Sequence, residues 1–192
     1  VSFGLVAVMA VAIAGCGTSS DSRQRNSELT PTDIACADGG ACVAGDIGPG
    51  GGIVFITPQT NGNLRPDYYL EAAPLNALAA ENCSKGKNNQ EIGAGKSNTE
   101  DVSQSCESNE VLNAITLAND LVFNGLDDWF LPSQDELVAL YANKNLFVCP
   151  ANGLCSSNFT AENYWSSTFA DGGQPIALNF ACICWVYFTS TN

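Results

Sequence analysis

The cysteines place the strongest constraint on what this chain can fold into. It has nine cysteines and no histidine, and the close pairs follow C-x5-C and C-x-C spacings. Zinc sites built from thiolates use other spacings, chiefly C-x-x-C, and no such pair occurs here. The spacings therefore favour disulfide bonds over a metal site. Disulfides persist in proteins that are exported from the cell.

The N-terminal segment carries a signature of export. Residues 1–14 are uncharged and mostly apolar, and the string Ile13-Ala14-Gly15-Cys16 follows from them. The run is too short to cross a bilayer as a helix, which takes about 20 residues, and it matches the apolar core of a secretory signal. The string resembles the lipobox of bacterial lipoproteins. We therefore predict a signal peptide over residues 1–15 and lipid attachment at Cys16; an ordinary signal peptide that precedes a cysteine is the alternative.

Lipid attachment at Cys16 predicts a protein of the bacterial cell envelope, anchored to a membrane and facing the periplasm or the cell surface. Residues 16–35 are rich in Ser, Thr, Asn and Asp, which is typical of a flexible tether. A coil of this length reaches about 20–25 Å. The folded domain then covers residues 36–192, which is enough chain to bury a core.

The charge balance narrows the class of partner. The chain has 7 basic and 20 acidic residues, for a net charge of −13. An acidic surface repels nucleic acids, anionic lipid head groups and sulfated polysaccharides. We therefore expect no nucleic-acid partner and no sulfated polyanion. Membrane attachment is expected to come from the lipid anchor.

The pattern of apolar and turn-forming residues predicts both helices and strands. Apolar residues three or four apart predict a helix over 110–124, and a capping box of Ser133 and Glu136 begins a second helix. The polar stretch 81–109 has no periodicity and is expected to be an irregular loop. Strands are predicted at four β-branched or alternating segments, which are 53–56, 68–73, 164–168 and 176–188. The second segment is expected to pair with the first as a hairpin. The alternation over 176–181 predicts a half-buried strand.

Eight cysteines remain besides Cys16, and an even number predicts that all of them form disulfides. Cys83 and Cys106 would close the long polar loop, and Cys149 and Cys155 flank a Pro-Ala-Asn-Gly turn that they would staple. The eight are Cys36, Cys42, Cys83, Cys106, Cys149, Cys155, Cys182 and Cys184.

Five blocks of sequence resemble successive motifs of the DUF1566 domain family, which includes the C-terminal domain of the Legionella collagen-like adhesin. The blocks occur in the family's order, as GDIGPGGGIVF at 45–55, LEAAP at 70–74, GAGKSNT at 93–99, DWFLPSQDEL at 128–137 and YWSST at 164–168. The resemblance implies a C-type-lectin-like α+β fold with short antiparallel sheets, two helices and long disulfide-stapled loops. It also implies a binding role at the cell surface or in the periplasm, with no established catalytic residues.

The resemblance also bears on the remaining cysteines. Lectin-like folds bring the two ends of the domain together, which implies cross-links between Cys36 or Cys42 and Cys182 or Cys184. A bond from Cys182 to Cys184 within one strand would be strained, because the two side chains would lie on the same face too far apart.

Candidate ligand residues lie in two places. Trp165 is followed by Ser166 and Ser167, and a ring beside hydroxyls suits a sugar, which stacks on the ring and forms hydrogen bonds around it. Core packing is the alternative for Trp165. Asp127 and Asp128 could ligate calcium and bridge a glycan through the ion. We predict no other cofactor.

Two functions of different classes follow. The first is a lipid-anchored, non-catalytic binding or adhesion module that recognises a neutral glycan or an envelope protein. The second is an enzyme on a lectin-like scaffold, of the formylglycine-generating type, which would use a reactive cysteine pair. The binding module is favoured, because a chain without histidine lacks the ordinary Ser-His-Asp and Cys-His machinery.

Overall fold

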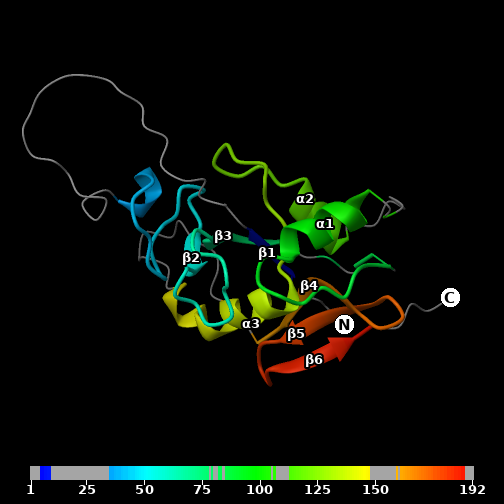
Figure 1. Cartoon of the computed structure of the whole chain (residues 1–192). Helices are drawn as coiled ribbons and strands as arrows, with labels where there is room; N and C mark the ends of the chain where they lie inside the picture. The colour runs from blue at the N-terminus through cyan, green and yellow to red at the C-terminus, as the bar shows by residue number, and fades with distance from the viewer. Residues whose placement is uncertain are drawn as a thin grey trace, which may run out of the picture.

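Two three-stranded antiparallel sheets and three α-helices make up the described part of the chain (Figure 1). The computed structural model describes residues 5–9, 35–77, 79, 82–83, 85–104, 106, 113–147, 159 and 161–188, of which 5–9 and 74–77 are described by their backbone. Cys16, Cys149 and Cys155 lie outside the described residues. No helix among the described residues is long and apolar enough to cross a membrane.

The first sheet has the strand order β1-β3-β2. β2 (Ile53–Ile56) pairs antiparallel with β3 (Leu70–Ala77), and Ile53 lies opposite Ala72, which confirms the predicted pairing of these segments. β1 (Leu5–Met9) pairs antiparallel with the other edge of β3. The structure therefore places part of the predicted signal peptide in a sheet of the domain.

The second sheet is a meander of β4 (Asn163–Ala170), β5 (Gln174–Asn179) and β6 (Cys184–Tyr187), in that order. The strand predicted over 176–188 is thus two strands, and residues 180–183 form the turn between them. β5 is the middle strand and β6 is an edge strand.

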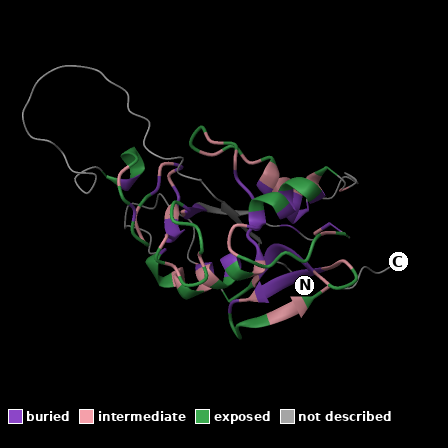
Figure 2. Cartoon of the chain, in the orientation of Figure 1, coloured by how far each residue is buried: buried purple, intermediate pink, exposed green. Residues whose placement is uncertain are grey.

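Both faces of the second sheet are covered. Tyr164 and Leu178 pack with α3 (Gln134–Ala142), whereas Trp165 and Ala177 pack with side chains of the two other helices. The alternation along β5 predicted one solvent-facing side, but Ala177 is only 1% exposed. The reason is that β5 has a strand on each side and a core cluster on each face. Figure 2 shows β5 as an almost wholly buried strand.

A helix lies inside the stretch 81–109 that was expected to be irregular. α1 (Gly95–Ser103) buries Asn98, Thr99 and Val102 against the core. Two of these three residues are polar, so the helix lacks the apolar face by which a periodic pattern is recognised. The Thr99 hydroxyl donates to the Gly95 carbonyl within the helix, at 2.9 Å.

The next helix is shorter than the one predicted over 110–124. α2 (Ala114–Asn119) is capped by Asn113, whose side chain accepts the Thr116 N–H, and residues 107–112 lie outside the description. The chain reverses soon after α2, because Asn124 and Gly125 both have positive φ, at 49° and 80°. An Asn-Gly pair in this conformation is typical of a tight turn between paired strands.

α3 begins as predicted. Ser133 Oγ accepts the Glu136 N–H at 3.4 Å, and Glu136 Oε2 accepts the Ser133 N–H at 2.8 Å. This confirms the capping box. Leu137 and Leu140 are fully buried on the core face of the helix.

The disulfides confirm one predicted pairing and correct another. Cys83 is bonded to Cys106, as expected for a staple of the long loop. The cross-links expected between the ends of the domain are absent from the described residues, because each end forms its own bond: Cys36 pairs with Cys42, and Cys182 pairs with Cys184. The C-x-C pair can close because Cys182 lies in the turn and Cys184 begins β6, so the two cysteines do not lie along one strand.

Candidate functional site

The predicted sugar-binding surface on β4 lies in the core. Trp165 is 2% exposed, and Ser166 and Ser167 are 0% exposed. The Trp165 ring packs against Phe188 with ring centroids 4.3 Å apart, and its indole N–H donates to the Ala79 carbonyl at 3.3 Å. This corrects the expectation that the three residues present a ring and hydroxyls to a ligand.

The hydroxyls of the YWSST block connect neighbouring segments. Ser166 Oγ donates to the Pro132 carbonyl at 3.3 Å, and Thr168 Oγ1 donates to the Asn89 carbonyl at 2.7 Å. Thr168 Oγ1 also accepts the Gln134 N–H at 3.0 Å. The hydroxyls are therefore occupied in joining β4 to the 85–91 loop and to the start of α3.

Asp127 and Asp128 line a small pocket of about 210 Å³ that also contains Lys96 and Glu100. Asp127 is exposed, whereas Asp128 is partly buried and its Oδ1 has no hydrogen-bond partner. Among the described residues, no group of three or more His, Cys, Asp and Glu side chains could hold a metal ion. Calcium binding by these two residues stays a prediction.

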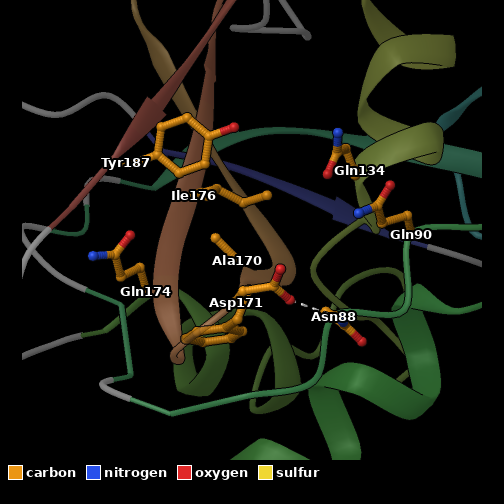
Figure 3. A pocket seen from close by; sticks show the side chains of 9 residues that line it. Asn88, Gln90, Gln134, Ala170, Asp171, Gln174, Ile176 and Tyr187 are labelled. Atoms are coloured by element: carbon orange, nitrogen blue, oxygen red, sulfur yellow. Dashed lines mark hydrogen bonds between the residues drawn. The ribbon is translucent and has the colours of Figure 1, made fainter.

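A different pocket, of about 330 Å³, combines four amide side chains with two aromatic residues, of which Tyr187 is the exposed one. We call it the amide pocket. In Figure 3, Gln90 and Gln134 lie on one side of it, and Gln174 and Tyr187 lie on the other. Its lining residues are Asn88, Gln90, Gln134, Phe169, Ala170, Asp171, Gln174, Ile176 and Tyr187.

Three parts of the fold meet at the amide pocket. The β5–β6 hairpin supplies Gln174, Ile176 and Tyr187, and α3 supplies Gln134 as its first residue. The remaining polar lining comes from the 85–91 loop and from the turn between β4 and β5. These segments lie far apart in the sequence, so only the tertiary fold assembles the pocket.

Hydrogen bonds fix the 85–91 loop from two sides. The Lys87 carbonyl accepts the Phe169 N–H at 2.8 Å, and the Gln90 carbonyl accepts the Asp135 N–H at 3.0 Å. Between them, the Asn98 side-chain amide donates to the Asn89 carbonyl at 2.8 Å. The pocket wall is therefore preformed, which lowers the entropy lost when a ligand binds.

The polar side chains of the pocket are available to a ligand. Asn88 Nδ2 donates to Asp171 Oδ1 at 3.4 Å, a long contact. The side-chain amides of Gln90, Gln134 and Gln174 make no hydrogen bond within the described part of the chain. Each amide offers an acceptor oxygen and two donor hydrogens. Such groups match hydroxyls, which both donate and accept.

An aromatic side chain borders the amide pocket. Tyr187 lies on the edge strand β6, directly opposite Ile176 of β5, and it is 58% exposed. Ile176 is 3% exposed and forms an apolar part of the lining. An exposed ring beside a small apolar floor suits a ligand that has both an apolar face and polar edges.

The electrostatics of the lining favour a neutral ligand. The lining includes no basic residue, and Asp171 is its one carboxylate. The nearby Lys87 is ion-paired with Asp101. An anion would therefore find no cation among the lining residues, whereas a neutral molecule rich in hydroxyls would find several hydrogen-bond partners.

The two buried carboxylates among the described residues, Glu71 and Glu136, do not line the amide pocket. Burial raises the pKa of Glu136. Hydrogen bonds from the Ser133 and Gly93 N–H groups act in the opposite direction, but the effect of burial is larger. Burial also raises the pKa of Glu71, and the hydrogen bonds from the Gly50 and Gly52 N–H groups offset only part of this increase. Each carboxylate thus accepts hydrogen bonds from backbone N–H groups of other segments, which indicates a structural role.

Comparison of the chain with protein-family models, curated proteins and solved structures gives no match.

Sequence reasoning missed the whole amide pocket. Asn88 and Gln90 belong to a polar stretch that reads like any solvated loop, and Gln134 was assigned to a helix start. Tyr187 falls in the segment 176–188, which is predicted to be a strand. The only available signal was the cluster of amides at residues 88–90, which is too common in loops to indicate a site.

Proposed function

We propose that this protein is a lipid-anchored, non-catalytic binding module of the bacterial cell envelope, and that its amide pocket recognises a neutral glycan. We further propose that the domain is of the DUF1566 type with a C-type-lectin-like topology. The amide pocket is the observation that supports the proposal. Its volume is about 330 Å³, and its lining includes four amide side chains and one exposed ring but no basic residue.

The pocket chemistry supports a sugar ligand in two ways. A pyranose ring has an apolar face that can lie on Tyr187 and a rim of hydroxyls within reach of the amides. A net hydrogen bond contributes about 0.5–1.5 kcal/mol, so a few such bonds with one stacked ring give modest affinity. A small pocket also favours one or two sugar residues over a long chain.

The cysteines bear on the choice between binding and catalysis. The enzyme alternative needs a reduced, reactive cysteine pair. Each of the six cysteines in the described part of the domain is in a disulfide. This favours the binding role, and the tether and Cys16 anchor would hold the binding domain away from the membrane surface.

The test is a glycan array probed with the oxidised mature protein, followed by calorimetric titration of any glycan that binds. We expect neutral oligosaccharides to bind and sulfated ones not to bind. Tyr187→Ala and Gln174→Ala should each weaken binding about tenfold, which corresponds to about 1.4 kcal/mol. Tyr187→Phe keeps the ring and should retain most of the affinity.

Leu146→Ala is the matched control, because Leu146 is 40% exposed and lies outside the amide pocket. It should bind like the wild type. An array on which no neutral glycan binds would contradict the proposal. Binding that persists unchanged in Tyr187→Ala would place the glycan at another surface.

A further inference from the structure

The turn between β5 and β6 carries the most accessible disulfide in the described part of the chain. Cys182 and Cys184 are both exposed, with Cα atoms 5.2 Å apart. By contrast, Cys36, Cys42 and Cys83 are 6%, 4% and 5% exposed. A thiol in solution can therefore approach the C-x-C disulfide directly.

The residue enclosed by this disulfide has an unfavourable backbone conformation. Ile183 has a φ of 56°, in the left-handed region, and its side chain is 58% exposed. A β-branched residue there is disfavoured by about five- to thirtyfold. Such a conformation persists only where surrounding bonds impose it.

Hydrogen bonds and the disulfide together impose this turn. The Ile183 N–H donates to the Asn179 carbonyl at 2.9 Å. Asn179 Oδ1 accepts the N–H groups of Ala181 and Cys182, at 2.9 and 3.2 Å. Opening the disulfide would remove one of the restraints that hold Ile183 in this conformation, so reduction relieves a local cost.

We propose that the Cys182–Cys184 disulfide is a site of reversible thiol–disulfide exchange with a dithiol partner. Exposed disulfides in unfavourable local conformations are the ones that take part in exchange. The site lies at the opposite end of the β5–β6 hairpin from Tyr187, so it is distinct from the amide pocket.

The exchange proceeds in two balanced steps. A partner thiolate attacks Cys184 Sγ to form a mixed disulfide, and the bonding electron pair leaves on Cys182 Sγ, which takes up a proton. The second partner thiol then attacks the partner sulfur of the mixed disulfide and expels Cys184 as a thiol. Two electrons and two protons pass to the cysteine pair, and the partner becomes a disulfide.

The surroundings of Cys182 stabilise its reduced, neutral thiol. Its Sγ lies 3.3 Å from Asn179 Oδ1. After reduction, the Cys182 thiol can donate a hydrogen bond to that oxygen. This bond is available only to the reduced form, and it shifts the equilibrium toward reduction.

The test is a redox titration of the full-length oxidised protein in glutathione buffers, followed by alkylation and peptide mass spectrometry. Cys83–Cys106 serves as the internal reference, because it staples the domain core. The titration gives an equilibrium constant for the reduction of each disulfide by glutathione. We expect this constant to be at least about tenfold larger for Cys182–Cys184 than for Cys83–Cys106. Ile183→Gly should shift the C-x-C equilibrium about five- to thirtyfold toward the disulfide.

Ile183→Val is the matched control, because it keeps the β-branched side chain, and it should match the wild type within about twofold. An intact Cys83–Cys106 bond reports that each variant is folded. The proposal is overturned if the wild-type C-x-C bond opens only together with Cys83–Cys106. It is also overturned if Ile183→Gly and Ile183→Val titrate alike.

Discussion

Glu136 Oε1 accepts a hydrogen bond from the Gly93 N–H at 2.7 Å, across 43 positions of the sequence. The same oxygen accepts the Tyr68 hydroxyl at 3.2 Å. Glu71 binds the glycine-rich block at 45–55 in a similar way. Its two carboxylate oxygens accept hydrogen bonds from the Gly50 and Gly52 N–H groups, at 2.8 and 2.7 Å. Each glycine-rich block thus encloses a carboxylate from a later block, which gives these motifs a structural purpose.

Glu136→Gln should lower the free energy of unfolding by about 2–3 kcal/mol. An amide nitrogen would replace one acceptor oxygen and leave a buried N–H or O–H donor unsatisfied. Urea denaturation measures the change. Asp135→Asn is the control: Asp135 is adjacent but exposed, so its substitution should change stability by less than about 0.5 kcal/mol.

Stability should fall as the pH rises above about 4.5, because burial raises the pKa of both Glu71 and Glu136 above the ordinary value of 4.5. A raised carboxyl pKa means that the native state holds its proton more tightly than the unfolded state. The stabilisation is complete below the unfolded pKa and is lost as the pH passes the folded one. Unfolding free energies across this range should decline less steeply in Glu71→Gln. A wild-type stability that increases with pH would contradict the prediction.

Gly52→Ala should destabilise the domain by about 3 kcal/mol, as overpacking against fixed atoms does. A Cβ at this position would lie 2.5 Å from the Ala72 carbonyl oxygen, which belongs to the backbone of β3 and cannot rotate away. Thermal or urea unfolding would measure the loss. Gly172→Ala has no atom within 4 Å but a φ of 87°, so it should show only the conformational cost of about 1 kcal/mol.

Replacing Cys83 and Cys106 together by Ala should lower the unfolding free energy by about 3 kcal/mol, mainly through the entropy of the unfolded chain. The two residues are 23 positions apart, whereas Cys36 and Cys42 are 6 apart. Replacing Cys36 and Cys42 together by Ala should therefore lower the unfolding free energy by less, about 2 kcal/mol. Equal losses from the two double variants would show that loop length does not govern the effect.

The protein should not be retained on heparin at about 0.15 M salt, where charges are screened beyond about 8 Å. Lys85, Lys87 and Lys96 all lie before or within α1, but Lys87 is paired with Asp101 and Lys96 shares a pocket with Glu100. With a net charge of −13, this cluster gives no free basic surface of useful size. Retention of the mature protein at that salt concentration would refute the charge argument.

Features encoded by neighbouring residues were predictable from the sequence. The capping box needs only Ser133 and Glu136, and the pairing of β2 with β3 follows from two apolar segments separated by turn residues. α1 was missed because Asn98 and Thr99 take core positions that usually hold apolar residues. Thr99 can occupy such a position because its Oγ1 accepts the Leu131 N–H at 3.1 Å, which no local pattern reveals.

The candidate site depended on contacts that the sequence does not display. Trp165 with its hydroxyl neighbours has the composition of a ligand surface, yet a core cluster on each face of the second sheet buries it. The amide pocket arises where the 85–91 loop meets α3 and the β5–β6 hairpin. Polar loop residues have the same composition whether they face a ligand or bulk water, so Asn88 and Gln90 gave no sign of their position.

β1 belongs to the segment that is predicted to be a signal peptide, so the first sheet would be affected by removal of that segment. Cleavage before Cys16 would remove Leu5–Met9, and the β3 backbone at Ala72, Asn76 and Ala77 would lose the strand that lies opposite it. An open strand edge binds extended segments of other chains. If that cleavage occurs, the exposed edge of β3 would be able to accept an extended segment of another chain or of a second copy, and that segment would complete the sheet.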